Sequence, residues 1–138
     1  MKKSVFIVLC VIAFSTLEVI AQCNSEAFSN QCIPKLASGF NFLKSYKIEK
    51  GAKEFVEYSY VFTKGTQYMI NICAANNTDG IVVSLYDSNR NKVASSKING
   101  QFISAIAYPC NTTGIYYIQY TFDGSTGYCG GSALGFKR

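Results

Sequence analysis

Short runs of Val, Ile, Tyr and Phe that alternate with polar residues constrain the fold of this chain more than any other feature. The clearest run covers residues 114–122, Gly-Ile-Tyr-Tyr-Ile-Gln-Tyr-Thr-Phe, and lies between the turn-forming residues 111–113 and Asp123-Gly124. β-Branched and aromatic residues suit a pleated surface, and successive residues of a strand face opposite sides. The pattern predicts a central strand whose core face carries Tyr116, Ile118, Tyr120 and Phe122.

Similar runs recur along the chain, separated by Gly, Asn, Asp and Pro. About eight strands are expected, at residues 40–48, 55–62, 67–73, 81–87, 92–96, 102–108, 114–122 and 128–136. Short strands at this regular spacing are typical of a sandwich or barrel. The predicted fold is therefore an all-β, antiparallel, jelly-roll-like sandwich over residues 40–138, and no helical period is evident after residue 21.

The first 21 residues have the pattern of a secretory signal peptide. Lys2 and Lys3 precede an apolar run, and Val19-Ile20-Ala21 supplies a small-residue cleavage site. The apolar run is shorter than the roughly 20 residues of a membrane-spanning helix. We therefore expect a secreted protein, extracellular or periplasmic, with no transmembrane segment in the mature chain. Lipid attachment at Cys23 is the alternative, although Gln22 stands where that motif requires a small residue.

Six cysteines are present, and cleavage after Ala21 removes Cys10. An exported chain is expected to form disulfides, and the odd number that remains leaves one thiol unpaired or joined to a partner chain. If the strands alternate up and down, Cys73 and Cys129 lie at one end of the domain and Cys110 at the other. This favours Cys73–Cys129, with Cys110 bonded to Cys32 or Cys23. A local Cys23–Cys32 bond that leaves Cys110 free is the competing arrangement. In either case, residues 22–39 are expected to be an irregular segment tied down by disulfide.

Charge and residue types exclude several classes of function. Loss of Lys2, Lys3 and Glu18 with the leader lowers the formal net charge from +5 to +4, and the remaining cations are spread along the chain without a basic stripe for nucleic acid. The chain has no histidine, which excludes imidazole-dependent triads and His-ligated metals. The cysteines are not closely paired as in zinc sites, and no convergent pair of carboxylates is evident. We expect no enzymatic activity, no cofactor and no metal.

Tyrosines on outward strand faces are the best functional indication. Tyr86, Tyr117 and Tyr128 are the candidate ligand-binding residues, because exposed tyrosines can stack on sugar rings or anchor a protein partner. The first hypothesis is a non-catalytic module that binds carbohydrate or a cell-surface protein. The second is a structural or protein-interaction subunit, with a covalent partner attached through the odd cysteine.

The order of these motifs resembles a known family. Tyr68-x-Ile70-x-Ile72, then residues 81–87 with a polar hairpin, then Gly-x-Tyr-Tyr-Ile at residues 114–118, resemble bacterial pre-peptidase C-terminal (PPC-like) domains. The chain is also similar to small secreted, cysteine-containing proteins of Bacteroidetes-type bacteria. The PPC-like resemblance implies a secreted jelly-roll-like sandwich that accompanies exported enzymes and has no catalytic residues of its own.

Overall fold

The structure is a computed structural model that describes residues 23–51, 53–74, 80–124 and 129–138. The expected signal peptide and the candidate residue Tyr128 lie outside the described residues. Among the described residues, no helix is long and apolar enough to cross a membrane.

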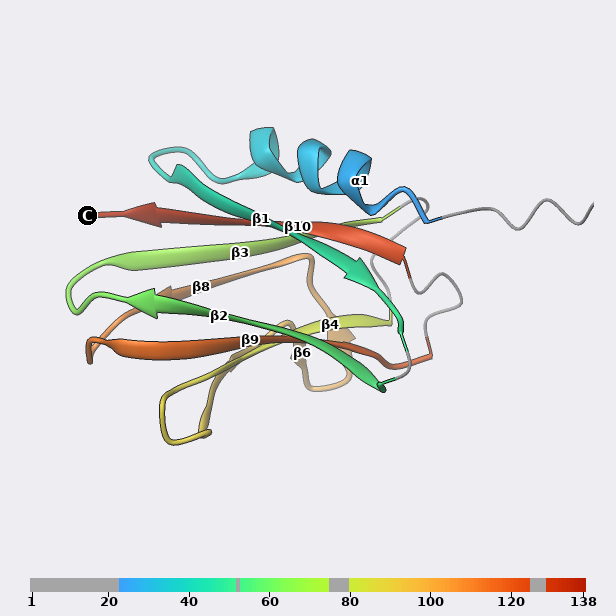
Figure 1. Ribbon diagram of the computed structural model, residues 1–138. Helices are drawn as coiled ribbons and strands as arrows, with labels where there is room; N and C mark the ends of the chain where they lie inside the picture. The colour runs from blue at the N-terminus through green and yellow to red at the C-terminus, as the bar shows by residue number, and fades with distance from the viewer. Residues whose placement is uncertain (1–22, 52, 75–79, 125–128) are drawn as a thin grey trace, which may run out of the picture.

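Two four-stranded antiparallel sheets pack face to face, which confirms the all-β sandwich (Figure 1). One sheet has the order β1-β10-β3-β8 and the other β2-β9-β4-β5. The first sheet contains β1 (Asn41–Glu49), β10 (Cys129–Lys137), β3 (Gln67–Ala74) and β8 (Ala105–Pro109). The second contains β2 (Phe55–Phe62), β9 (Gly114–Phe122), β4 (Ile81–Tyr86) and β5 (Lys92–Ser95).

The strand predictions agree with the structure except at residues 96–105. The single strand expected at 102–108 is divided, because β6 (Lys97–Ile98) and β7 (Gln101–Phe102) form a separate hairpin before β8 begins. Asn99 and Gly100 both have positive φ, at 51° and 78°. Two such residues make the tight turn whose twist suits a two-residue hairpin, so this turn belongs to β6–β7 and not to the start of a long strand.

The core lies between the sheets and is built from alternate residues of the strands. Tyr116, Ile118 and Tyr120 of β9 are each at most 2% exposed, as predicted. Ile70 of β3 meets them from the other sheet and is 1% exposed. Aromatic rings fill one end, where Phe62 stacks on Tyr68 with ring centroids 3.8 Å apart.

The prediction of an irregular segment at residues 22–39 is wrong, because it contains the helix α1 (Ser25–Cys32) and a 3₁₀ turn (Ile33–Lys35). Asn24 caps α1 by accepting a hydrogen bond from Ala27 N at 3.3 Å. Ser29 Oγ donates to the carbonyl of Tyr46 in β1 at 2.8 Å. This helix is too short and polar to show a helical period, and its stability comes from the sheet beneath it.

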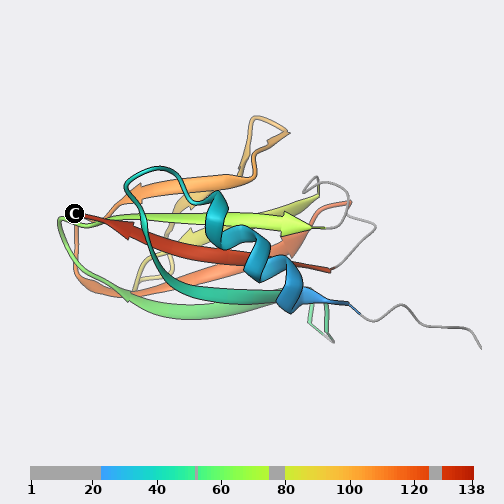
Figure 2. The same ribbon diagram turned by 90° about the horizontal axis from the view of Figure 1, so that it is seen from above.

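The helix α1 covers the outer face of the β1-β10-β3-β8 sheet (Figure 2). Asn71 alternates with the core residues Ile70 and Ile72 and so faces away from the core, yet it is only 4% exposed because it lies under this helix. Its Nδ2 donates to Cys32 O at 2.8 Å, and its Oδ1 accepts from Ala133 N at 2.9 Å. The molecule thus has three layers, helix on sheet on sheet.

The favoured disulfide pairing is also wrong. The bonds are Cys23–Cys129 and Cys32–Cys73, and Cys110 is free and buried. Cys73 and Cys129 do lie at the same end, as expected, since Gly131 of β10 pairs with Cys73 of β3. The predicted pair fails because α1 brings its own two cysteines to that end, one before the helix and one at its last residue. The part of the competing arrangement that leaves Cys110 free is correct, but its local Cys23–Cys32 bond is not formed.

Candidate binding face on the second sheet

The candidate site lies on the outer face of the β2-β9-β4-β5 sheet, the face opposite the core. Tyr86 of β4 and Tyr117 of β9 are directly paired in the register of this sheet. Paired residues of antiparallel strands share a face, so the structure brings these two predicted residues together. Both are half-buried.

A tight turn between β4 and β5 positions the residue that dominates this face. Asp87 Oδ1 accepts hydrogen bonds from Asn89 N and Asn91 N, both at 2.9 Å. Arg90 N donates to Asp87 O at 3.0 Å, and Arg90 has a φ of 64°. The polar hairpin expected after residues 81–87 is therefore present, and its turn directs Arg90 back over the sheet.

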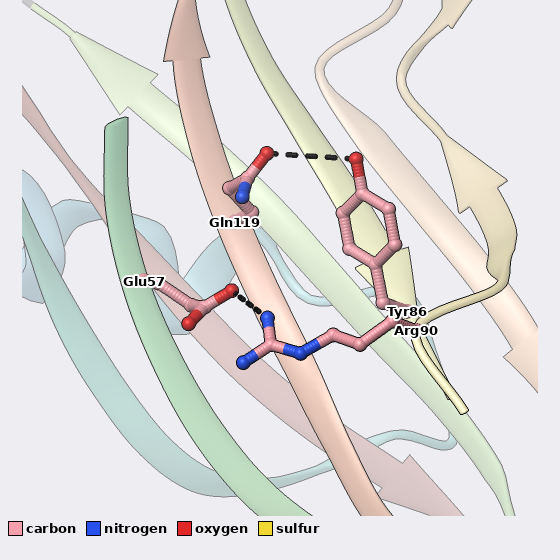
Figure 3. A network of polar contacts seen from close by, with 4 residues as sticks. All are labelled: Glu57, Tyr86, Arg90 and Gln119. Atoms are coloured by element: carbon pink, nitrogen blue, oxygen red, sulfur yellow. Dashed lines mark hydrogen bonds and ion pairs between the residues drawn. The ribbon is translucent and has the colours of Figure 1, made fainter. Parts of the chain in front are cut away.

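The guanidinium of Arg90 lies over the ring of Tyr117, with Cζ 3.6 Å from the ring centroid. Its Nη1 contacts Glu57 Oε1 of β2 at 2.5 Å (Figure 3). The hydrogen bond to Glu57 raises the pKa of Arg90 above its ordinary value, with smaller contributions from the charge of Glu57 and from Tyr117. The carboxylate of Glu57 on β2, the guanidinium of Arg90 in the turn and the ring of Tyr117 on β9 thus form one array.

The second tyrosine has weaker partners. Tyr86 Oη donates to Gln119 Oε1 at 3.5 Å, at the limit of a hydrogen bond (Figure 3). Lys92 Nζ lies 5.8 Å from the centroid of the Tyr86 ring. Sugar stacking needs an open ring face, and at Tyr117 the guanidinium occupies that position.

An apolar region adjoins the array on the same face. Val61 of β2 pairs with Ile115 of β9, and these side chains are 56% and 48% exposed. Together with Ser59 and Tyr60 they line a shallow hollow of about 440 Å³. We define the outer face by eight residues, which are Glu57, Ser59, Val61, Tyr86, Arg90, Ile115, Tyr117 and Gln119.

Sequence reasoning missed most of this face. Glu57 and Gln119 belong to strands that were predicted correctly, but only the sheet order places β2 beside β9 and makes them neighbours. Arg90 lies in the polar hairpin expected after residues 81–87, and no sequence pattern indicates that its side chain reaches over β9. The alternation in β2 was the available signal, since it places Glu57, Ser59 and Val61 opposite the predicted core face.

The cysteine expected to offer a covalent link is not accessible. Cys110 is 3% exposed, and its Sγ donates to Thr112 O at 3.2 Å, beside the hydroxyl of Tyr116 at 3.6 Å. A partner chain could reach this thiol only after local opening. The Cys23 sulfur is bonded to Cys129 and is therefore not available for a lipid.

In the part of the chain that the structure describes, His, Cys, Asp and Glu form no group of three that could hold a metal ion.

No protein-family model matches the chain, and no curated protein matches it. Among solved structures, the chain is similar to PliG of Aeromonas hydrophila, described as a periplasmic lysozyme inhibitor of g-type lysozyme. The identity is 12% and the TM-score 0.46, over 72% of this chain and 87% of that one. The PPC-like resemblance is not tested by these comparisons and stays a prediction.

Proposed function

We propose that this protein is an exported, non-catalytic module that binds a protein partner through the outer face of the β2-β9-β4-β5 sheet. The observation that carries the proposal is the difference between the two sheets. One sheet is covered by the disulfide-tied helix α1, whereas the other carries an array of Arg, Tyr and Glu beside two exposed aliphatic side chains.

The composition of the outer face favours a protein over a sugar. Protein interfaces are enriched in Tyr and Arg, which are frequent hot spots in a well-packed centre. Tyr117 and Arg90 are held in place before binding by each other and by Glu57, so little ordering entropy is lost on contact. Val61 and Ile115 supply apolar area beside them.

Export is supported by the disulfides. Such bonds form and persist in oxidising compartments, and two of them attach the N-terminal helix to the sheet. The signal-peptide pattern at residues 1–21 supports the same location. We therefore place the interaction outside the cytoplasm, extracellular or periplasmic.

Site-specific photo-cross-linking tests the proposal. A photoreactive residue at Ile115 is expected to give a defined adduct with one protein other than a second copy of this chain, in cells that secrete the full chain, because that position adjoins the Arg90–Tyr117 array. The same residue at Glu26, which is exposed on α1, is the matched control and should give no such adduct.

The second measurement distinguishes specific contact from proximity. Arg90→Ala should abolish the Ile115 adduct while the far-ultraviolet circular dichroism of the protein stays unchanged. An adduct that is equal from both positions, or unaffected by Arg90→Ala, contradicts the proposal. Saturable binding to a glycan that is lost in Tyr117→Ala would replace it with the carbohydrate hypothesis.

A further inference from the structure

The edge strand β2 differs from the other edge strands of the sandwich. An edge strand presents unpaired backbone groups, and proteins protect such edges with lysine, proline, bulges or short length. β1 carries Lys44 and Lys47 and has a register shift between Phe42 and Lys44.

The remaining two edges are protected as well. β8 has five residues and ends at Pro109, and β5 has four residues, begins at Lys92 and is irregular opposite Tyr86. β2 has eight residues, no lysine, no proline and an unbroken register with β9. Within the described residues, no strand pairs with its other side. Figure 2 shows β2, in green, along the border of the molecule.

We infer that two copies of this chain associate by antiparallel pairing of β2 with β2 of the second copy, about a twofold axis at Tyr58. The inference goes beyond the proposed function and does not depend on it. A twofold axis perpendicular to the sheet leaves the outer faces of both copies on the same side of the joined sheet. Each β2 residue on the outer face must therefore pair with an outer-face residue of the second copy. Centring the axis on Tyr58 pairs Phe55 with Val61 and Glu57 with Ser59 across the interface.

This register places exposed apolar side chains together. Phe55 is 36% exposed and Val61 is 56% exposed in the single chain. Directly opposed side chains have Cβ atoms about 4.5–5.5 Å apart. Phe55 of each copy therefore covers Val61 of the other, at the hollow lined by Ser59, Val61 and Ile115.

Charge does not oppose the pairing. Glu57 is the one charged residue in β2, and its carboxylate is already bonded to Arg90 of the same chain. The twofold axis consequently brings together two neutralised pairs and not two free carboxylates. On the core side, Val56 lies opposite Tyr60 of the second copy, which adds a further apolar contact.

The first test is sedimentation equilibrium of the protein secreted from the full chain, at concentrations up to roughly 100 μM, where a weak dimer is populated. We expect a concentration-dependent dimer. Val61→Lys should raise its dissociation constant by about tenfold or more, because a charge replaces apolar burial at both symmetric contacts. Ile98→Lys is the matched control, since Ile98 is 54% exposed in the β6–β7 hairpin and away from β2, and should leave the dimer unchanged.

The second test reads the register directly. The double variant Phe55→Cys with Val61→Cys should form a reducible covalent dimer, because directly paired residues have Cα separations within the range of a disulfide. Neither single variant should form a covalent dimer, because in this register Phe55 does not lie opposite Phe55 of the second copy and Val61 does not lie opposite Val61. A monomer at every concentration, a dimer that Val61→Lys does not weaken, or covalent dimers of the single variants would overturn the inference.

Discussion

The hydroxyl of Tyr120 donates a hydrogen bond to Ser132 Oγ at 2.6 Å and joins the two sheets across the core. Both residues are fully buried, and they lie on β9 and β10. Tyr46 lies in the same core but differs in one respect. Its hydroxyl is buried without a hydrogen-bond partner among the described residues.

Tyr120→Phe and Tyr46→Phe should therefore have opposite consequences. Tyr120→Phe leaves Ser132 Oγ buried and unsatisfied, and should lower the free energy of unfolding by about 1–3 kcal/mol. Tyr46→Phe removes a hydroxyl that lost its water on burial and should leave the stability unchanged or raise it by about 1 kcal/mol. Urea denaturation of both variants measures the difference. Equal losses would show that Tyr46 has a partner in solution.

Alkaline pH should unfold the protein. Burial raises the pKa of Tyr46, Tyr116 and Tyr120 in the folded state, whereas the unfolded residues titrate near the ordinary value of about 10. Above that pH the unfolded state binds fewer protons than the folded state, so stability falls as pH rises.

Tyrosinate absorbance measured against pH should accordingly have two phases. Exposed tyrosines ionise first, and the buried ones ionise together with the loss of circular dichroism. Return to neutral pH within minutes should restore the native spectrum. Ionisation of all tyrosines in one phase with the fold intact would contradict the burial of these rings.

Gly131→Ala should disrupt the contact between α1 and the sheet. A Cβ at Gly131 would lie 2.1 Å from Ser29 N and 2.5 Å from Ser29 Cα, which are backbone atoms of the helix. The helix would have to move, and we expect a loss of about 1–3 kcal/mol or more, as for overpacked cores. Gly51→Ala is the control, because a Cβ there meets nothing within 4 Å. Thermal unfolding of the two variants makes the comparison, and similar melting temperatures would contradict the close approach.

Disulfide mapping by mass spectrometry should find Cys23 linked to Cys129 and Cys32 to Cys73. The buried Cys110 should react with iodoacetamide only after the protein is denatured. In the chain-entropy description, these loops of 106 and 41 residues contribute about 5 and about 4 kcal/mol to stability. Paired Cys→Ser variants analysed in urea test both values, and labelling of Cys110 in the native protein would contradict its burial.

The stack of Arg90 on Tyr117 should be visible in solution by nuclear magnetic resonance. A guanidinium 3.6 Å above a ring centroid lies in the shielding region of the ring, so the Arg90 side-chain signals should be shifted upfield. Tyr117→Leu should remove this shift, and Glu57→Gln should reduce it by loosening the guanidinium. Signals at ordinary positions in the wild-type protein would show that the array is not formed.

Much of the site could not be predicted, for a geometric reason. Tyr86 and Tyr117 were predicted to face outward from the alternation within their own strands. Arg90 and Glu57 join Tyr117 only because β2 pairs with β9 and the turn after β4 reaches over them. The alternation within a strand predicts which way its side chains face, but it does not predict which strand lies beside it.

By itself, the sequence determined the strands and their core faces, because period-two alternation of apolar residues can bury one face only in an extended conformation. The tertiary structure decided the rest. α1 is stable because Gly131 leaves room for its backbone and Asn71 donates a hydrogen bond to Cys32 O. The disulfide pairing follows from the positions that this helix gives to Cys23 and Cys32. These contacts join residues far apart in the chain, and their energies depend on the packed arrangement of both sheets and the helix.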